Sequence, residues 1–158
     1  MCISDAVPEK EEYRDSEKYE IKKWNWDAEG NLKDFLVRIN AIRKENPALQ
    51  MTRNIEFCDV NNDNLLCYYK ATGDHSNIIL VIVTLDPYHR QSGNITLPLS
   101  KLGIEQDRSY MAHDLLSGDR YVWQGASNYV ELDPSTTPAH IIKLRRRVKR
   151  EQDFDYFL

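Results

Sequence analysis

Short β-strand patterns separated by turn residues fill the chain from residue 53 to residue 144. The predicted strands are 53–60, 65–70, 78–85, 93–97, 109–114, 119–123, 128–132 and 139–144. Strands at about ten-residue spacing with turn formers between them indicate an antiparallel β-sandwich or barrel. No helical pattern alternates with these strands, which excludes a parallel α/β fold.

Two of the predicted strands carry further information. The run from Ile78 to Leu85 is rich in β-branched residues and does not alternate with polar residues, so it predicts a central strand covered on both faces. Strands 53–60 and 65–70 flank the turn-forming Asn-Asn-Asp-Asn segment 61–64 and predict a hairpin with Cys58 opposite Cys67. Two reduced thiols are the preferred interpretation of that pair, and a strained disulfide is the alternative.

One amphipathic helix is predicted before the strands, at residues 31–45. Its apolar positions repeat at three- and four-residue steps on one face, at Leu32, Phe35, Leu36, Ile39 and Ile42. Asn31 is a suitable N-cap and Pro47 ends the pattern. No second helix is predicted to cover this stripe, so the helix docks on the strands or on something missing. Residues 1–30 are polar and acid-rich and predict a loop without a core of its own, hence mobile.

Length and charge exclude several classes of protein. A chain of 158 residues is shorter than a (β/α)8 barrel, which needs about 250. With 21 basic and 25 acidic residues the net charge is −4, which disfavours a nucleic-acid or anionic-membrane partner. The three cysteines form no CxxC motif, and neither an export signal nor a membrane-spanning run is visible. We therefore expect a cytoplasmic protein.

Two residue groups have both a functional and a plain interpretation. The run from Lys143 to Arg150 has six basic residues in eight, typical of a nucleic-acid or phosphate patch, but acidic residues follow it at once. A solvated tail or a domain-docking segment is the preferred interpretation. The second group is aromatic and offers either sugar-stacking platforms or core residues, with the latter more common. Its members are Trp24, Trp26, Tyr121, Trp123 and Tyr129.

The sequence singles out no catalytic or metal site. The four histidines are far apart, and none is at ligand spacing from a cysteine or another histidine. A carboxylate pair can perform glycosyl transfer, but none of the 25 acidic residues stands out as such a pair. Gly-rich phosphate loops and GxSxG motifs are absent, so we expect no metal and no cofactor.

Long motifs nevertheless resemble one enzyme family. They are segments 10–21 and 31–50, Leu-Asp-Pro at 85–87, His-Asp-Leu-Leu-Ser-Gly-Asp-Arg-Tyr-Val-Trp-Gln-Gly at 113–125, Asn-Tyr-Val-Glu-Leu-Asp-Pro at 128–134 and Pro-Ala-His-Ile at 138–141. Together they closely resemble the C-terminal end of the α-1,4-glucan:maltose-1-phosphate maltosyltransferases, of glycoside hydrolase family 13 in the α-amylase superfamily.

This resemblance implies a division of the chain into three parts. Residues 1–51 are the last loop and helix of a truncated catalytic barrel, residues 52–144 are a mainly β, antiparallel sandwich of the domain C type, and residues 145–158 are a charged tail. The nucleophilic aspartate and the acid/base glutamate of the family lie upstream of Met1. The isolated chain is therefore expected to be inactive and to hold no catalytic residue.

The resemblance also implies a role for one loop. The family's Ser-Glu-Lys-Tyr-Glu motif binds the donor maltose 1-phosphate, which assigns substrate binding to Lys18 and Tyr19 here. An ammonium and a phenolic hydroxyl are suitable donors to phosphate oxygens. The plain alternative is a surface ion pair of Lys18 with a neighbouring glutamate. Arg14 departs from the family's usual leucine, which puts a packing role for that position in doubt.

The implied partners are α-glucan, maltose 1-phosphate and the missing barrel, with a homodimer possible in the intact enzyme and neither nucleic acid nor membrane. The intact enzyme would transfer maltosyl units with retention of configuration. Two alternatives remain for the sandwich, namely a non-catalytic carbohydrate-binding module and a purely structural domain.

Overall fold

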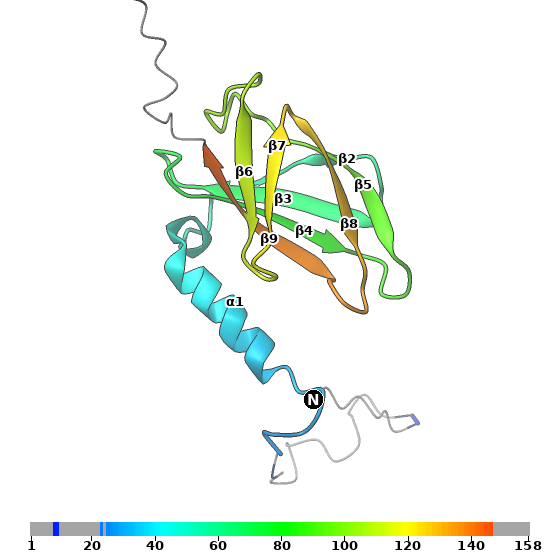
Figure 1. Cartoon of the computed structure of the whole chain (residues 1–158). Helices are drawn as coiled ribbons and strands as arrows, with labels where there is room; N and C mark the ends of the chain where they lie inside the picture. The colour runs from blue at the N-terminus through cyan, green and yellow to red at the C-terminus, as the bar shows by residue number, and fades with distance from the viewer. Residues whose placement is uncertain (1–7, 10–22, 24, 147–158) are drawn as a thin grey trace, which may run out of the picture. The chain divides into compact units, whose positions relative to one another are not determined.

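The computed structural model describes residues 8–9, 23 and 25–146. The chain divides into two units, Met1–Ala41 and Ile42–Leu158, and all strands belong to the second. Helix α1 (Lys33–Glu45) is followed by the 3-10 helix η1 (Pro47–Gln50) and by nine strands (Figure 1). The strands are β1 (Ile55–Phe57), β2 (Asp59–Val60), β3 (Leu65–Ala71), β4 (Ile78–Thr84), β5 (Gln91–Thr96), β6 (Ser109–Asp114), β7 (Arg120–Gln124), β8 (Ser127–Leu132) and β9 (Ala139–Arg146).

These strands form two antiparallel sheets, which confirms the predicted fold class. The larger sheet has the order β1-β3-β4-β9-β6-β7 and the smaller has the order β2-β5-β8. Consecutive strands β7 and β8 lie in different sheets, joined by a tight turn at Gly125 and Ala126. The buried Tyr110 hydroxyl donates to the Gly125 carbonyl over 2.9 Å and accepts from Asn128 Nδ2, also at 2.9 Å. This buried polar network fixes the turn between β7 and β8, which are edge strands of the larger and the smaller sheet.

The predicted central strand is central. Ile78, Leu80 and Ile82 of β4 enter the main core between the sheets, whereas Ile79 and Val81 enter a second cluster on the other face with Ala48 of η1. Burial on both faces explains why the β4 sequence does not alternate.

The hairpin register is confirmed, but the first strand is divided. The Cys58 amide donates to the Cys67 carbonyl over 2.9 Å, and both cysteines are free thiols. Segment 53–60, however, is not one strand: β1 pairs with β3 in the larger sheet, whereas β2 pairs with β5 in the smaller. The chain crosses between sheets at Cys58. It then passes so close to β5 that a Cβ on Gly93 would lie 2.8 Å from Asn61 Oδ1.

The predicted helix is present and starts two residues later than expected, at Lys33. The Asn31 side chain still satisfies a free amide at the start of the helix, because its Oδ1 accepts the Lys33 amide at 2.9 Å. At the other end, a buried amide cluster fixes the chain to the sandwich. Asn77 Nδ2 donates to Asn46 Oδ1 over 3.0 Å, and the Ala48 amide donates to Asn77 Oδ1 over 3.1 Å.

Candidate functional site

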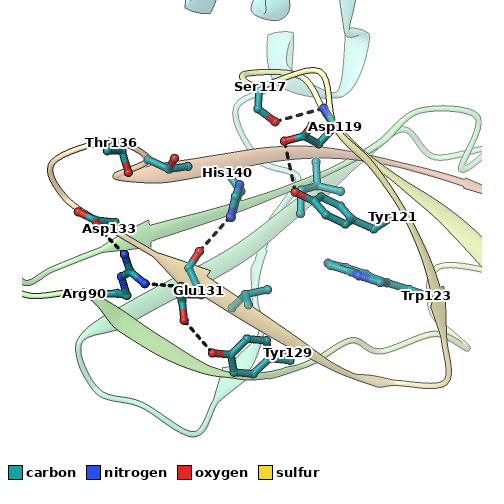
Figure 2. A pocket seen from close by; sticks show the side chains of 13 residues that line it. Arg90, Ser117, Asp119, Tyr121, Trp123, Tyr129, Glu131, Asp133, Thr136 and His140 are labelled. Atoms are coloured by element: carbon teal, nitrogen blue, oxygen red, sulfur yellow. Dashed lines mark hydrogen bonds and ion pairs between the residues drawn. The ribbon is translucent and has the colours of Figure 1, made fainter.

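An open pocket of about 460 Å³ lies where β7 and β8 separate into different sheets (Figure 2). Two aromatic residues come from β7 and one comes from β8. Charged and hydroxyl residues come from three loops, from β8 and from β9. Its polar and aromatic lining consists of Arg90, Ser117, Asp119, Tyr121, Trp123, Tyr129, Glu131, Asp133, Thr136, Thr137 and His140.

The aromatic side of the pocket brings together three of the five predicted sugar-stacking residues. Tyr121 and Tyr129 are 41% and 59% exposed, so their rings are accessible. The Tyr129 hydroxyl donates to Glu131 Oε2 over 3.1 Å, which fixes the ring. Trp123 is half-buried and meets Tyr110 edge-on at 6.3 Å, so it is partly a core residue. Trp26 belongs to the other unit, and Trp24 lies outside the described residues.

The opposite side of the pocket is charged. The Arg90 guanidinium donates to Glu131 Oε1 and to Asp133 Oδ2, each at 3.2 Å. Hydrogen bonds from the Ser135 hydroxyl and amide, together with Arg90, lower the pKa of Asp133. Two carboxylates already form ion pairs with the Arg90 guanidinium, so this side of the pocket is better suited to a neutral polar ligand than to an anion.

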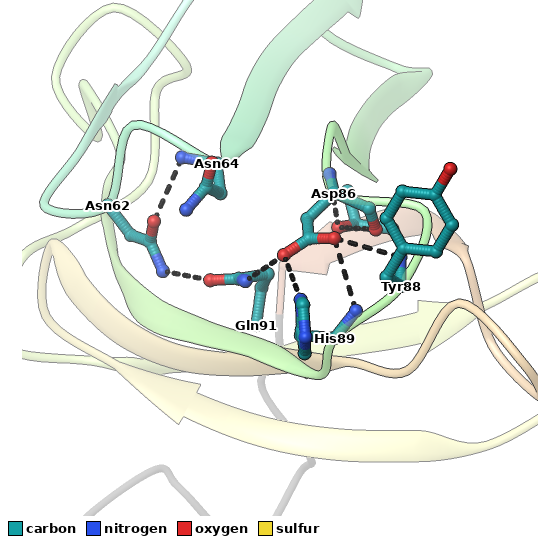
Figure 3. A network of polar contacts seen from close by, with 7 residues as sticks. Asn62, Asn64, Asp86, Tyr88, His89 and Gln91 are labelled. Carbon is teal, nitrogen blue, oxygen red and sulfur yellow. Dashed lines mark hydrogen bonds and ion pairs between the residues drawn. The ribbon is translucent and has the colours of Figure 1, made fainter.

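A polar network holds the loop that precedes Arg90 (Figure 3). Asp86 Oδ1 accepts the Tyr88 and His89 amides at 2.8 and 3.1 Å, and Oδ2 accepts Gln91 Nε2 at 2.8 Å. These hydrogen bonds, that of the Tyr88 amide above all, lower the pKa of Asp86 to about 2. The turn is therefore pinned on both sides of Arg90, which positions the guanidinium at the pocket.

His140 of the pocket lining pairs with the buried Asp114, a pair that sequence reasoning missed. Asp114 is fully buried, and its Oδ2 lies 2.7 Å from His140 Nδ1. The carboxylate also accepts from the Leu116 amide, the Ser117 hydroxyl and the Ile141 amide. Both residues belong to motifs quoted above, in segments 113–125 and 138–141. Only the pairing of β6 with β9 shows that these motifs meet.

The two groups stabilise each other's charged form. Burial disfavours the His140 cation, but the hydrogen bond and the charge of Asp114 outweigh it, so the pKa of His140 is raised. Burial likewise opposes ionisation of Asp114, yet the hydrogen bonds from His140 and Leu116 prevail and lower its pKa. His140 Nε2 faces the Glu131 carbonyl oxygen at 3.3 Å. Both ring nitrogens thus face acceptors, as an imidazolium requires.

A pH dependence of stability follows. The contribution of His140 is complete below its unfolded pKa of about 6.5 and is lost as pH rises through its higher folded pKa. The contribution of Asp114 is present above about pH 3.9 and is lost as pH falls through its lower folded pKa. The pair should therefore stabilise the domain most between about pH 4 and 6.5. Urea unfolding should show that the free energy of unfolding of the wild type falls between pH 5.5 and pH 8.5, and that His140→Gln lacks this fall. An equal fall in both proteins would contradict the assignment.

The predicted donor-binding residues, Lys18 and Tyr19, lie outside the described residues, as do residues 147–150 of the basic run. The first four residues of that run, 143–146, belong to β9. Among the described residues, no group of three or more His, Cys, Asp or Glu side chains is arranged to hold a metal ion. No helix in the same part of the chain is long and apolar enough to cross a membrane.

The fold defines the class of domain. Solved structures with the same arrangement include the α-amylase of Geobacillus thermoleovorans, with a TM-score of 0.56 and 17% identity over 79% of this chain and 25% of that chain. A maltogenic α-amylase from Thermotoga neapolitana also has a TM-score of 0.56, with 10% identity over 76% of this chain and 27% of that chain. The sandwich therefore resembles in fold the C-terminal β-domain of α-amylases.

The sequence then identifies the family. A family model described as "GLGE, C-terminal" matches residues 57–144. The α-1,4-glucan:maltose-1-phosphate maltosyltransferase of Rhodospirillum rubrum is 46% identical over 144 residues, which is 91% of this chain and 21% of that enzyme. The enzyme of the same name from Myxococcus xanthus is 40% identical over 157 residues, or 99% of this chain and 24% of that enzyme. This chain belongs to the GLGE C-terminal family and spans about a fifth to a quarter of the length of these relatives.

Proposed function

We propose that this chain provides the C-terminal domain of a maltosyltransferase that moves maltosyl units from maltose 1-phosphate to α-1,4-glucan. In this proposal its catalytic carboxylates belong to a barrel outside these 158 residues, and the isolated chain has no activity. The sandwich then supports the barrel, and the loop before α1 contacts the donor. The high identity to maltosyltransferases over nearly the whole chain supports this function.

The apolar stripe of α1 is the observation that carries the proposal. Leu32, Phe35 and Leu36 are 45%, 43% and 53% exposed, and within the predicted stripe only Ile42 is buried. An amphipathic helix gains most of its stability by burying such a face, at about 1.5–3 kcal/mol for each large side chain. The stripe therefore suits a helix that packs on a larger body, as the last helix of a barrel does.

A domain graft tests this function. The region of the Rhodospirillum rubrum enzyme that aligns with this chain is replaced by the chain, and phosphate release from maltose 1-phosphate is followed with a maltooligosaccharide acceptor. The graft is expected to be active. Lys18→Ala should raise the KM for maltose 1-phosphate with little effect on folding, because the ammonium would contact the donor phosphate. Lys33→Ala, which removes an exposed lysine from α1, is the matched control.

The pocket favours a second candidate function, non-catalytic binding of a neutral sugar. It offers accessible aromatic rings on one side, for the apolar face of a pyranose, and carboxylates, a guanidinium and hydroxyls on the other for sugar hydroxyls. This arrangement supports the carbohydrate-binding alternative for the sandwich.

Titration of the chain with maltoheptaose tests the second candidate. Trp123 lines the pocket, so its fluorescence and its indole NMR signal should change with sugar concentration. Tyr129→Ala should weaken the response at least ten-fold, whereas Tyr88→Ala, at an exposed tyrosine that does not line the pocket, should not. Absence of a response up to millimolar sugar would reject the candidate.

A further inference from the structure

The outer face of the larger sheet carries a cluster of cations. Strand register places His113 of β6 opposite both Arg120 of β7 and Lys143 of β9. Arg145, two residues further along β9, lies opposite Met111. Since Ala112 and Leu144 point into the core, their neighbours point outward. We define the basic sheet face as Arg120, His113, Lys143 and Arg145.

This face has no acidic residue among its own strand positions. Side chains alternate along each strand, so the core residues identify which positions of the larger sheet face outward. None of these outward-facing positions is an Asp or a Glu. The side chains of Arg120 and Arg145 are exposed and form no ion pair and no side-chain hydrogen bond among residues 25–146. The Lys143 ammonium donates to Asn46 Oδ1 over 3.1 Å. The charge of Glu45 favours the Lys143 cation, and the charge of the buried Asp114 favours the His113 cation.

The cations therefore repel one another. Burial, followed by the charges of Arg120 and Arg145, lowers the pKa of His113. Burial and Arg145 lower the pKa of Lys143 in the same way. Beside them, Met111 and Val122 are 38% and 79% exposed and lie directly opposite each other. A face that is both basic and apolar suits an acidic segment with large apolar side chains.

The chain itself contains such a segment. Residues 151–158 read Glu-Gln-Asp-Phe-Asp-Tyr-Phe-Leu, with three acids and four large apolar residues. We propose that residues 151–158 dock on the basic sheet face of the same chain, with their carboxylates at its cations and their aromatic residues on Met111 and Val122. This assigns an intramolecular role to the basic run that sequence reasoning left as a docking segment.

Chain length permits this docking. Strand β9 ends at Arg146, and Glu151 is five positions further along the chain, a reach of up to roughly 17 Å. Strand β7 is two strands away from β9, which is about 10 Å at the usual spacing. Arg145, Met111 and Val122 lie in the outward-facing cross-strand row nearest this end of β9, so the segment has to turn back over only a short distance.

NMR of the 158-residue chain tests the proposal. In the triple variant Glu151→Gln, Asp153→Asn, Asp155→Asn, the methyl signals of Met111 and Val122 should shift and the pKa of His113 should fall, because the carboxylates that favour its cation are gone. The variant Asp27→Asn, Glu29→Gln, Asp63→Asn makes the same change of charge at exposed positions elsewhere and should leave these signals unchanged. Arg120→Gln with Arg145→Gln should shift the Phe154 and Tyr156 ring signals, whereas Arg53→Gln should not.

Two results would overturn the proposal. Identical Met111, Val122 and His113 signals in the wild type and the acid-neutralised variant would show that the segment does not reach this face. Shifts that grow with protein concentration, together with a doubled mass in sedimentation, would assign the face to the segment of a second copy. Concentration-independent shifts support docking within one chain. None of these results depends on the transferase activity of the graft.

Discussion

Asp114→Ala is expected to lower the free energy of unfolding of the sandwich by about 3–5 kcal/mol, the usual cost of removing one partner of a buried ion pair. The alanine leaves the His140 cation without its counter-charge and removes the carboxylate that accepts the Leu116 and Ile141 amides. Urea denaturation near pH 5.5, where both groups are charged, measures the effect.

Two further variants separate the loss of the Asp114 charge from the loss of its side-chain volume. Asp107→Ala removes an exposed carboxylate and should change stability by no more than about 0.5 kcal/mol. Asp114→Asn keeps a polar side chain of the same size, so it should cost less than the alanine and should lower the pKa of His140. A loss below about 1 kcal/mol for Asp114→Ala would mean that the pair does not hold β6 to β9.

Leu36→Asp in the domain graft is expected to destabilise the enzyme by more than about 2 kcal/mol, because it removes the burial of a leucine and places an unpaired carboxylate in an apolar contact. In the isolated chain, where Leu36 is exposed, the same change should have little effect. Thermal unfolding of the graft and of the isolated chain gives both values.

Val37→Asp is the matched control, because Val37 is also exposed and lies on the side of α1 away from the stripe. It should change the free energy of unfolding of both proteins by no more than about 0.5 kcal/mol. If Leu36→Asp were as mild as Val37→Asp in the graft, the stripe would not be buried against the barrel.

Local patterns predicted the strands well because each has its own periodicity and turn signals. The run at 78–85 predicted a strand buried on both faces, and β4 is one. The division of segment 53–60 could not be predicted, since it depends on whether a neighbour belongs to the larger or the smaller sheet. Alternation along a single segment is identical in either case.

The candidate pocket was only partly predictable for the same reason. Tyr121 and Trp123 are two residues apart on β7, so the sequence places them on one face. The approach of Tyr129, Arg90 and Glu131 results from pairing of β5 with β8. Asp114 and His140 are 26 residues apart, and neither spacing nor residue type indicates that they meet.

Phosphate release by the domain graft tests the proposal that this chain completes a maltosyltransferase. The graft should release phosphate from maltose 1-phosphate at a rate comparable to that of the Rhodospirillum rubrum enzyme and should elongate the acceptor by maltosyl units. The isolated chain should release none. A folded graft that releases no more phosphate than the same enzyme without the grafted region would contradict the proposed function.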